Sequence, residues 1–113
     1  MRDDVFFLKE IICQCDKIRS RIDAFGGNEE DFASNEVFQT SCAFHIIQIG
    51  ESVNMLSSEL KSKYPDVDWK GITGYRNIIV HNYGGVRMES LWVSVIKEVP
   101  ELKEVCEQIL NDQ

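Results

Sequence analysis

The sequence has few of the residues that bind metals or form cross-links. It contains two histidines and four cysteines, the latter being Cys13, Cys15, Cys42 and Cys106. These cysteines form neither a CxxC pair nor a Cys/His spacing typical of a metal site. We therefore expect reduced thiols, no metal and no other cofactor.

Long hydrophobic runs are also missing. No apolar segment approaches the roughly 20 residues needed to cross a bilayer, and the chain opens on Arg2-Asp3-Asp4 rather than on a signal peptide. We expect a cytoplasmic protein with no membrane segment. Its 113 residues, 43% of them hydrophobic, suit one domain over 1–113, small enough that a dimer interface would stabilise it.

Proline is confined to Pro65 and Pro100, and the apolar residues recur at spacings of three and four, which is typical of helices. The pattern predicts helices over 3–25, over 36–63, from Asp66 or Asp68 to Tyr83, and over 88–110. Inward positions include Val53, Leu56 and Leu60 in the second helix, Trp69, Ile72, Tyr75 and Ile79 in the third, and Leu91, Trp92, Val95, Ile96 and Val99 in the fourth.

Local signals support these boundaries. Asp3 or Asp4 would cap the first helix, Gly26-Gly27 would end it, and Pro100 would kink the last helix or divide it. Gly50 costs a helix about 1 kcal/mol relative to Ala, so we expect another helix to cross closely there. Together these patterns predict an all-α antiparallel bundle of four to five helices.

The formal net charge of −7 argues against a general nucleic-acid binder, since such proteins replace counterions with Lys and Arg. Residues 61–88, however, carry five basic and two acidic side chains, whereas both flanking segments are net acidic. Lys70 and Arg87 could therefore support a phosphate-attracting field around Arg76; an ordinary solvated surface is the alternative. The acidic remainder favours a basic protein partner.

The candidate site lies in the segment 74–85, which gathers Arg76, Asn77, His81 and Tyr83 and ends at two glycines. On a straight helix, Arg76 and Tyr83 nearly share a line, as do Asn77 and His81, but Arg76 and His81 are about 140° apart. They converge only if the helix bends or a second subunit closes the site.

This spacing resembles the motif of the HEPN superfamily, and specifically that of its HepT-type toxins. The motif is an Arg, four residues, a His, one residue and a Tyr, with an Asn directly after the Arg. Further family-like segments lie between residues 40 and 105. They are Gln48-Ile49-Gly50-Glu51-Ser52, Pro65 ahead of Asp68-Trp69, Leu91-Trp92, and Val99-Pro100-Glu101-Leu102.

The resemblance implies a HEPN-like helical fold and a metal-independent ribonuclease that is usually a homodimer. It also implies a partner, an MNT-type nucleotidyltransferase antitoxin, that neutralises the toxin and attaches AMP to the motif tyrosine, here Tyr83. Its position at a helix end beside two glycines is expected to let the phenol reach solvent.

The residues themselves suit attack of an RNA 2′-hydroxyl on the adjacent phosphate. Histidine changes charge near neutral pH, so His81 could act as general acid or base, while Arg76 could hold the phosphate bidentately. Asn77 would orient His81 or the phosphate, and Tyr83 would contact the RNA backbone.

Three alternatives remain open. The polar residues of 74–85 could merely cap a helix and form salt bridges. The chain could be a HEPN domain that binds RNA or a nucleotide without cutting it, or a dimeric module that only binds an antitoxin. His45, the other histidine, has no polar partner nearby in the sequence and is expected to be a packing or surface residue.

Overall fold

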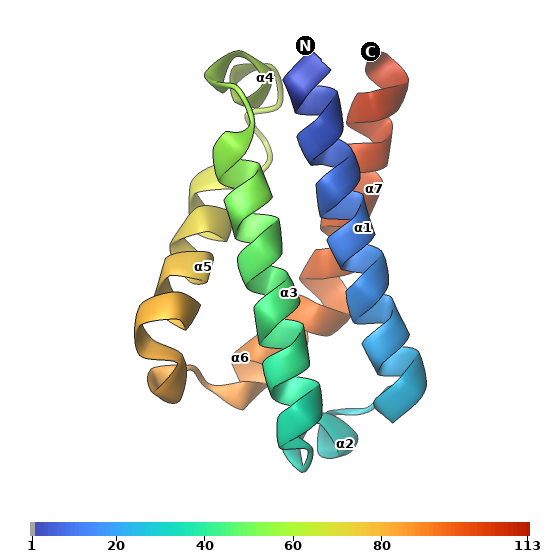
Figure 1. Cartoon of the computed structure of the whole chain (residues 1–113), viewed down its shortest axis with the longest axis vertical. Coiled ribbons are helices and arrows are strands. Elements are labelled where there is room, and N and C mark those ends of the chain that lie inside the picture. The colour runs from blue at the N-terminus through green and yellow to red at the C-terminus, as the bar shows by residue number, and fades with distance from the viewer. Residues whose placement is uncertain (1) are drawn as a thin grey trace.

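The computed structural model describes residues 2–113, and every regular element in this range is helical (Figure 1). In chain order the elements are α1 (Arg2–Phe25), α2 (Glu29–Ala33), α3 (Glu36–Met55), α4 (Ser58–Lys63), α5 (Trp69–Asn82), a 3₁₀ turn η1 (Tyr83–Gly85), α6 (Met88–Val93), a π-helical segment η2 (Ser94–Glu98) and α7 (Val99–Asp112). The predicted all-α class is confirmed.

Neighbouring long helices run in opposite directions. In Figure 1, α1 descends, α3 ascends beside it, α5 descends at the left and α7 ascends beside α1. The most extensive packing joins α1 to α3, α3 to α5, and α1 to α7. The predicted antiparallel bundle is therefore confirmed, and α5 lies at one edge, packed chiefly against α3.

The first helix ends where it was predicted to end, but it begins at Arg2, so Asp3 and Asp4 lie within its first turn and the predicted cap at either residue is wrong. α1 ends at Phe25, and Gly26 then adopts a φ of 125°, in the left-handed region that favours glycine. A side chain at Gly26 would also overlap Asp31. The chain therefore leaves α1 sharply and enters the short helix α2.

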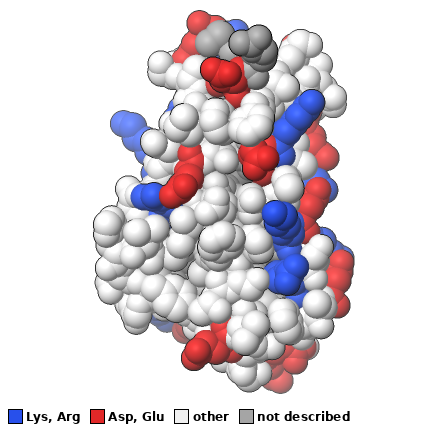
Figure 2. Space-filling view, in the orientation of Figure 1, with Lys and Arg blue, Asp and Glu red and all other residues white. Residues whose placement is uncertain are grey.

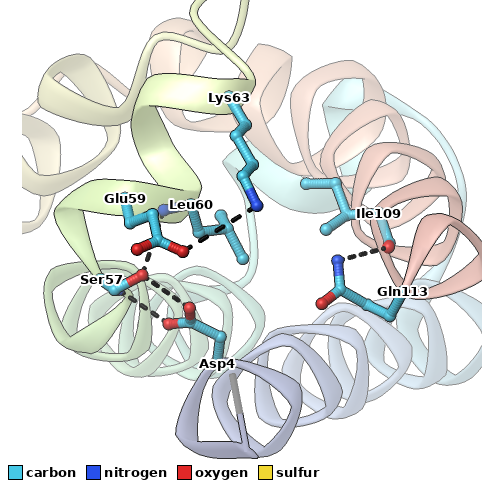
Figure 3. A network of polar contacts seen from close by, with 7 residues as sticks. All are labelled: Asp4, Ser57, Glu59, Leu60, Lys63, Ile109 and Gln113. Atoms are coloured by element: carbon cyan, nitrogen blue, oxygen red, sulfur yellow. Dashed lines mark hydrogen bonds and ion pairs between the residues drawn. The ribbon is translucent and has the colours of Figure 1, made fainter.

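The predicted helix over 36–63 is wrong, because the chain breaks between α3 and α4. Ser57 caps α4 by accepting a hydrogen bond from the Leu60 backbone N–H at 3.1 Å. Asp4, only 2% exposed, in turn accepts from the Ser57 backbone N–H at 2.8 Å and the Ser57 hydroxyl at 2.6 Å (Figure 3). Leu56 and Leu60 stay buried on both sides of the break, so apolar periodicity does not reveal it.

The last predicted helix is divided, with Pro100 in the first turn of α7. The π-helical segment η2 precedes it and takes more residues per turn than an α-helix, which shifts the phase of the apolar stripe. Ile96, predicted to point inward, is consequently 39% exposed, whereas Val95 and Val99 are buried.

Aromatic side chains fix α6 beneath the bundle. Phe32 of α2 and Phe38 of α3 are fully buried with ring centroids 4.9 Å apart, and Phe32 lies 5.2 Å from Trp92 of α6. Burying a Phe side chain contributes about 1.5–3 kcal/mol. The cluster thereby anchors the chain that leaves α5. Among residues 2–113, no helix combines the length and apolar character that spanning a bilayer requires.

Candidate functional site

Helix α5 carries three residues of the predicted motif, Arg76, Asn77 and His81, and Tyr83 follows in η1. The start of α5 is well anchored. The Asp68 side chain caps it by accepting from the Gly71 N–H at 3.0 Å. The Trp69 indole donates to the Tyr64 carbonyl at 3.0 Å, and Trp69 and Ile79 are buried as predicted. These contacts fix the rotation of α5 about its axis, and hence which side chains face α3.

Gly50 is the point at which α5 crosses α3. A methyl group added at Gly50 would overlap the Cβ and Cγ atoms of Arg76. The close crossing predicted from Gly50 is therefore confirmed, and the residue that it brings against α3 is Arg76. A larger residue at position 50 would push the Arg76 backbone away.

The Arg76 guanidinium is held from two sides. Its Nη2 donates to Glu51 Oε1 at 2.7 Å, and its Nη1 donates to Asn77 Oδ1 at 2.7 Å. The Arg76 side chain is 28% exposed and that of Glu51 50%, so a ligand can reach the pair from solvent. An ion pair this exposed contributes little stability; its main effect is to orient the guanidinium.

The sequence did not predict that Glu51 pairs with Arg76. Glu51 was recognisable only as part of a family-like segment, directly after Gly50. The helix crossing at Gly50 explains the pairing, because it brings the adjacent residue Glu51 beside Arg76 although the two residues are 25 positions apart.

His81 stands apart from Arg76. It is exposed, and its ring makes no hydrogen bond or ion pair with any of the side chains of residues 3–113. α5 continues without interruption to Asn82, so the bend considered as a way to bring Arg76 and His81 together is absent. At five positions along a regular helix, the two lie about 140° apart around the axis. Within one chain, the structure joins Arg76, Asn77 and Glu51 but not His81.

One side of α5 nevertheless aligns three of the predicted residues. Counting about 100° per residue, Lys70, Asn77 and His81 fall within about 40° of one another, and all three are exposed. Lys70 forms no side-chain ion pair with the residues described here, so its charge is open to solvent. This side of α5 therefore presents an amine, an amide and an imidazole in one line.

Arg87, the other predicted supporting residue, lies elsewhere. Its guanidinium contacts Glu89 at 3.3 Å, and both side chains are well exposed. It lines a groove on the side of α5 that carries Tyr75, not the side that carries His81. Figure 2 shows that the surface over α3 and the lower part of α5 is largely uncharged, so the basic residues do not gather there.

Tyr83 contradicts the expectation that its phenol reaches solvent. η1 turns the chain so that the side chain packs against the core, and the hydroxyl is buried with no hydrogen-bond partner among the described residues. Burial raises the pKa of Tyr83, with smaller contributions from Glu36 and Cys42. Helix periodicity placed Tyr83 beside Arg76, but could not show which way the following turn directs it.

The remaining surface of the site is apolar. Large exposed hydrophobic side chains lie on both neighbouring helices, namely Phe44 and Met55 on α3 and Ile78 and Val80 on α5. Exposed apolar side chains that form one contiguous patch mark a protein interface, whereas isolated ones do not. Within residues 2–113, no three His, Cys, Asp or Glu side chains are grouped so that they could hold a metal ion.

Comparison with known proteins gives a consistent result. The model of the family described as "Ribonuclease HepT-like" matches residues 11–109. A protein of Caldanaerobacter subterraneus named "Putative RNase" is 32% identical over 95% of this chain and 94% of its own length. A protein of the same description from Methanocaldococcus jannaschii is 29% identical over 98% and 94%. "Probable ribonuclease HepT" of Thermococcus cleftensis is 28% identical over 71% and 73%. No solved structure matches.

Proposed function

Because the chain belongs to the HepT-like ribonuclease family, we propose that it is a toxin that cleaves RNA without a metal ion. The observation that carries the proposal is Arg76, oriented by Glu51 and Asn77 on the helix that also presents an exposed, unbonded His81. The test is whether purified protein cuts RNA with EDTA present, and whether that activity requires His81.

The reaction needs proton transfer and charge neutralisation. The RNA 2′-oxygen attacks the adjacent phosphorus, the bond from phosphorus to the 5′-oxygen breaks, and a 2′,3′-cyclic phosphate and a 5′-hydroxyl result. His81 removes the proton from the 2′-hydroxyl while water protonates the leaving 5′-oxygen, or His81 protonates the 5′-oxygen while water accepts the 2′-proton. Arg76 donates to the phosphate oxygens as negative charge develops, and Lys70 contacts the RNA backbone along the same side of α5.

The second subunit of a homodimer supplies what one chain lacks. Arg76 and His81 do not converge on the continuous α5, which lies at the bundle edge beside exposed Ile78 and Val80. A two-fold axis next to α5 would bring His81 of one copy opposite Arg76 of the other, since such an interface joins the same patch of both subunits. Each dimer would then hold two equivalent composite sites.

We expect two inactive variants to restore activity when mixed. Arg76→Ala and His81→Ala homodimers each lack a required residue in both sites, whereas a mixed dimer keeps one complete site. Random exchange makes half the dimers mixed, so activity should recover to about a quarter of wild type. RNA cleavage before and after co-refolding measures this; no recovery from dimers shown by mass spectrometry to be mixed would place the whole site within one chain.

A nucleotidyltransferase antitoxin of the MNT type is the proposed partner, and Tyr83 its proposed target. The buried hydroxyl must first become accessible, which requires η1 to swing away from α3. Gly84 and Gly85 follow Tyr83 directly and are exposed, so Tyr83 is the one side chain of this turn that has to leave the core. AMP on Tyr83 would add a phosphodiester anion that competes with RNA for the arginine.

Incubation with this partner and ATP is expected to add AMP to wild-type protein and to Tyr75→Phe, but not to Tyr83→Phe. Tyr75 is a matched control because its hydroxyl is also buried. Intact-mass and peptide mass spectrometry locate the adduct. Equal labelling of Tyr83→Phe would exclude Tyr83 as the modified residue and leave the nuclease proposal untouched.

A second candidate function is RNA or nucleotide binding without cleavage, or dimeric binding of an antitoxin alone. The observation that favours it is the ion pair between Glu51 and Arg76, because the Glu51 carboxylate accepts a hydrogen bond from the guanidinium that would otherwise bind a phosphate. RNA retained on the purified protein without any cleavage product, in wild type and His81→Ala alike, would support this function.

A further inference from the structure

A groove separate from the motif lies between α5, the segment from α6 to η2, and α7. Its volume is about 850 Å³, and it is open to solvent along one side. Figure 1 shows the two long helices that border it, α5 and α7, running in opposite directions, with α6 near their lower ends. Neither Arg76 nor His81 lines it, so the proposed reaction leaves this groove without a role.

The floor of the groove is apolar. Its side chains are branched aliphatic residues from four helices, α3, α5, α6 and α7, and from the loop before α5, and they include Ile46, Val67, Ile72, Val93, Leu102 and Val105. Val93 is 48% exposed although it is a large hydrophobic residue. An apolar floor of this kind binds the apolar side chains of a ligand and disfavours a hydrated one.

The rim of the groove is acidic. Five carboxylates surround the floor, namely Asp66, Asp68, Glu89, Glu98 and Glu101, against one basic side chain, Arg87, which is paired with Glu89. Asp66 and Glu101 enter no side-chain hydrogen bond or ion pair with the side chains of residues 3–113. RNA phosphates would be repelled here, whereas Lys or Arg on a ligand would be attracted.

We propose that this groove binds a basic amphipathic helix of a partner protein. Its apolar side chains would lie on the groove floor, as in other helix-in-groove complexes, and its Lys and Arg side chains would meet the acidic rim. A second copy of this chain fits poorly, because it would bring a formal charge of −7 to a surface that is already acidic.

A synthetic probe tests the proposal without knowledge of the partner. The peptide is roughly 15 residues long, a length at which isolated helices begin to form, with Leu on one face and Lys on the other. The matched peptide carries Glu in place of each Lys. We expect only the Lys peptide to bind ¹⁵N-labelled protein, with amide shifts concentrated at Val93, Leu102 and Val105.

The Val93→Asp variant distinguishes binding in the groove from general electrostatic attraction of a cationic peptide to an acidic protein. It adds a negative charge, which would strengthen unspecific binding of a cationic peptide, but it removes apolar contact from the floor, so affinity should fall at least about tenfold. Val37→Asp is the control, since Val37 is 64% exposed and lies outside the groove. It makes the same charge change and should alter affinity less than about twofold.

A second pair of variants keeps the test decisive if Val93→Asp does not fold. Glu101→Lys at the rim should lower the affinity for the Lys peptide at least about fivefold. Glu104 is also exposed on α7 but lies outside the groove, so Glu104→Lys should lower this affinity much less. The proposal would be overturned by equal affinities of the two variants within each pair, or by amide shifts spread over the whole surface. It would also be overturned if a second copy of this chain covers the groove, which dissociation of a dimer by Val93→Asp would reveal.

Discussion

The His81→Ala protein is expected to cleave RNA about 10²–10⁴-fold more slowly than wild type, which is the usual contribution of a general acid or base. The assay follows a labelled RNA in buffer containing EDTA, where wild type should remain active because the proposed chemistry uses side chains alone. Arg76→Ala should lose about 10²–10³-fold, since it removes charge stabilisation rather than proton transfer.

Loss of fold does not account for this expected result. His81 is exposed and bonded to none of the side chains of residues 3–113, so its truncation should leave thermal unfolding unchanged. His45→Gln is the matched control: His45 is half-buried with its Nδ1 2.8 Å from Gln14 Oε1, the packing position expected from the sequence, and its variant should keep wild-type activity. Undiminished cleavage by folded His81→Ala would remove His81 from the mechanism, and loss of wild-type cleavage in EDTA would contradict metal independence.

What the sequence predicted well is local. The end of α1 depends on Gly26, the start of α5 on Asp68, and the rotation of α5 on its own apolar spacing. Each of these signals lies within a few residues of the feature that it determines. The all-α bundle follows, because four apolar stripes of helical period have to bury their faces against one another.

What the sequence predicted poorly depends on residues far apart in the chain. The break after α3 is stabilised by Asp4, which lies 53 positions from Ser57. The orientation of Arg76 depends on Glu51, and the burial of the Tyr83 hydroxyl depends on how η1 packs against the core. Periodicity carries no information on such pairings. The family resemblance supplied the motif but not the distance between Arg76 and His81.

The helix crossing at Gly50 links the fold to the proposed chemistry. Arg76 reaches Glu51 only because α3 and α5 approach each other closely at this glycine. An alanine there gains up to about 1 kcal/mol of helix propensity, but its methyl group meets the Cβ of Arg76, which is bound directly to the α5 backbone. That atom cannot rotate away as the end of a flexible side chain would, so the two helices must separate.

We therefore expect Gly50→Ala to lower the free energy of unfolding by about 1–2 kcal/mol, as overpacking exceeds the gain in propensity, and to slow RNA cleavage about 10- to 100-fold by displacing Arg76. Gly74→Ala is the matched control. Gly74 also lies within a helix, but an added methyl group there meets nothing within 4 Å, so this variant should be up to about 1 kcal/mol more stable than wild type. Denaturant unfolding and cleavage rates measure both variants. A stabilised Gly50→Ala protein with wild-type activity would show that the position of Arg76 does not depend on this crossing.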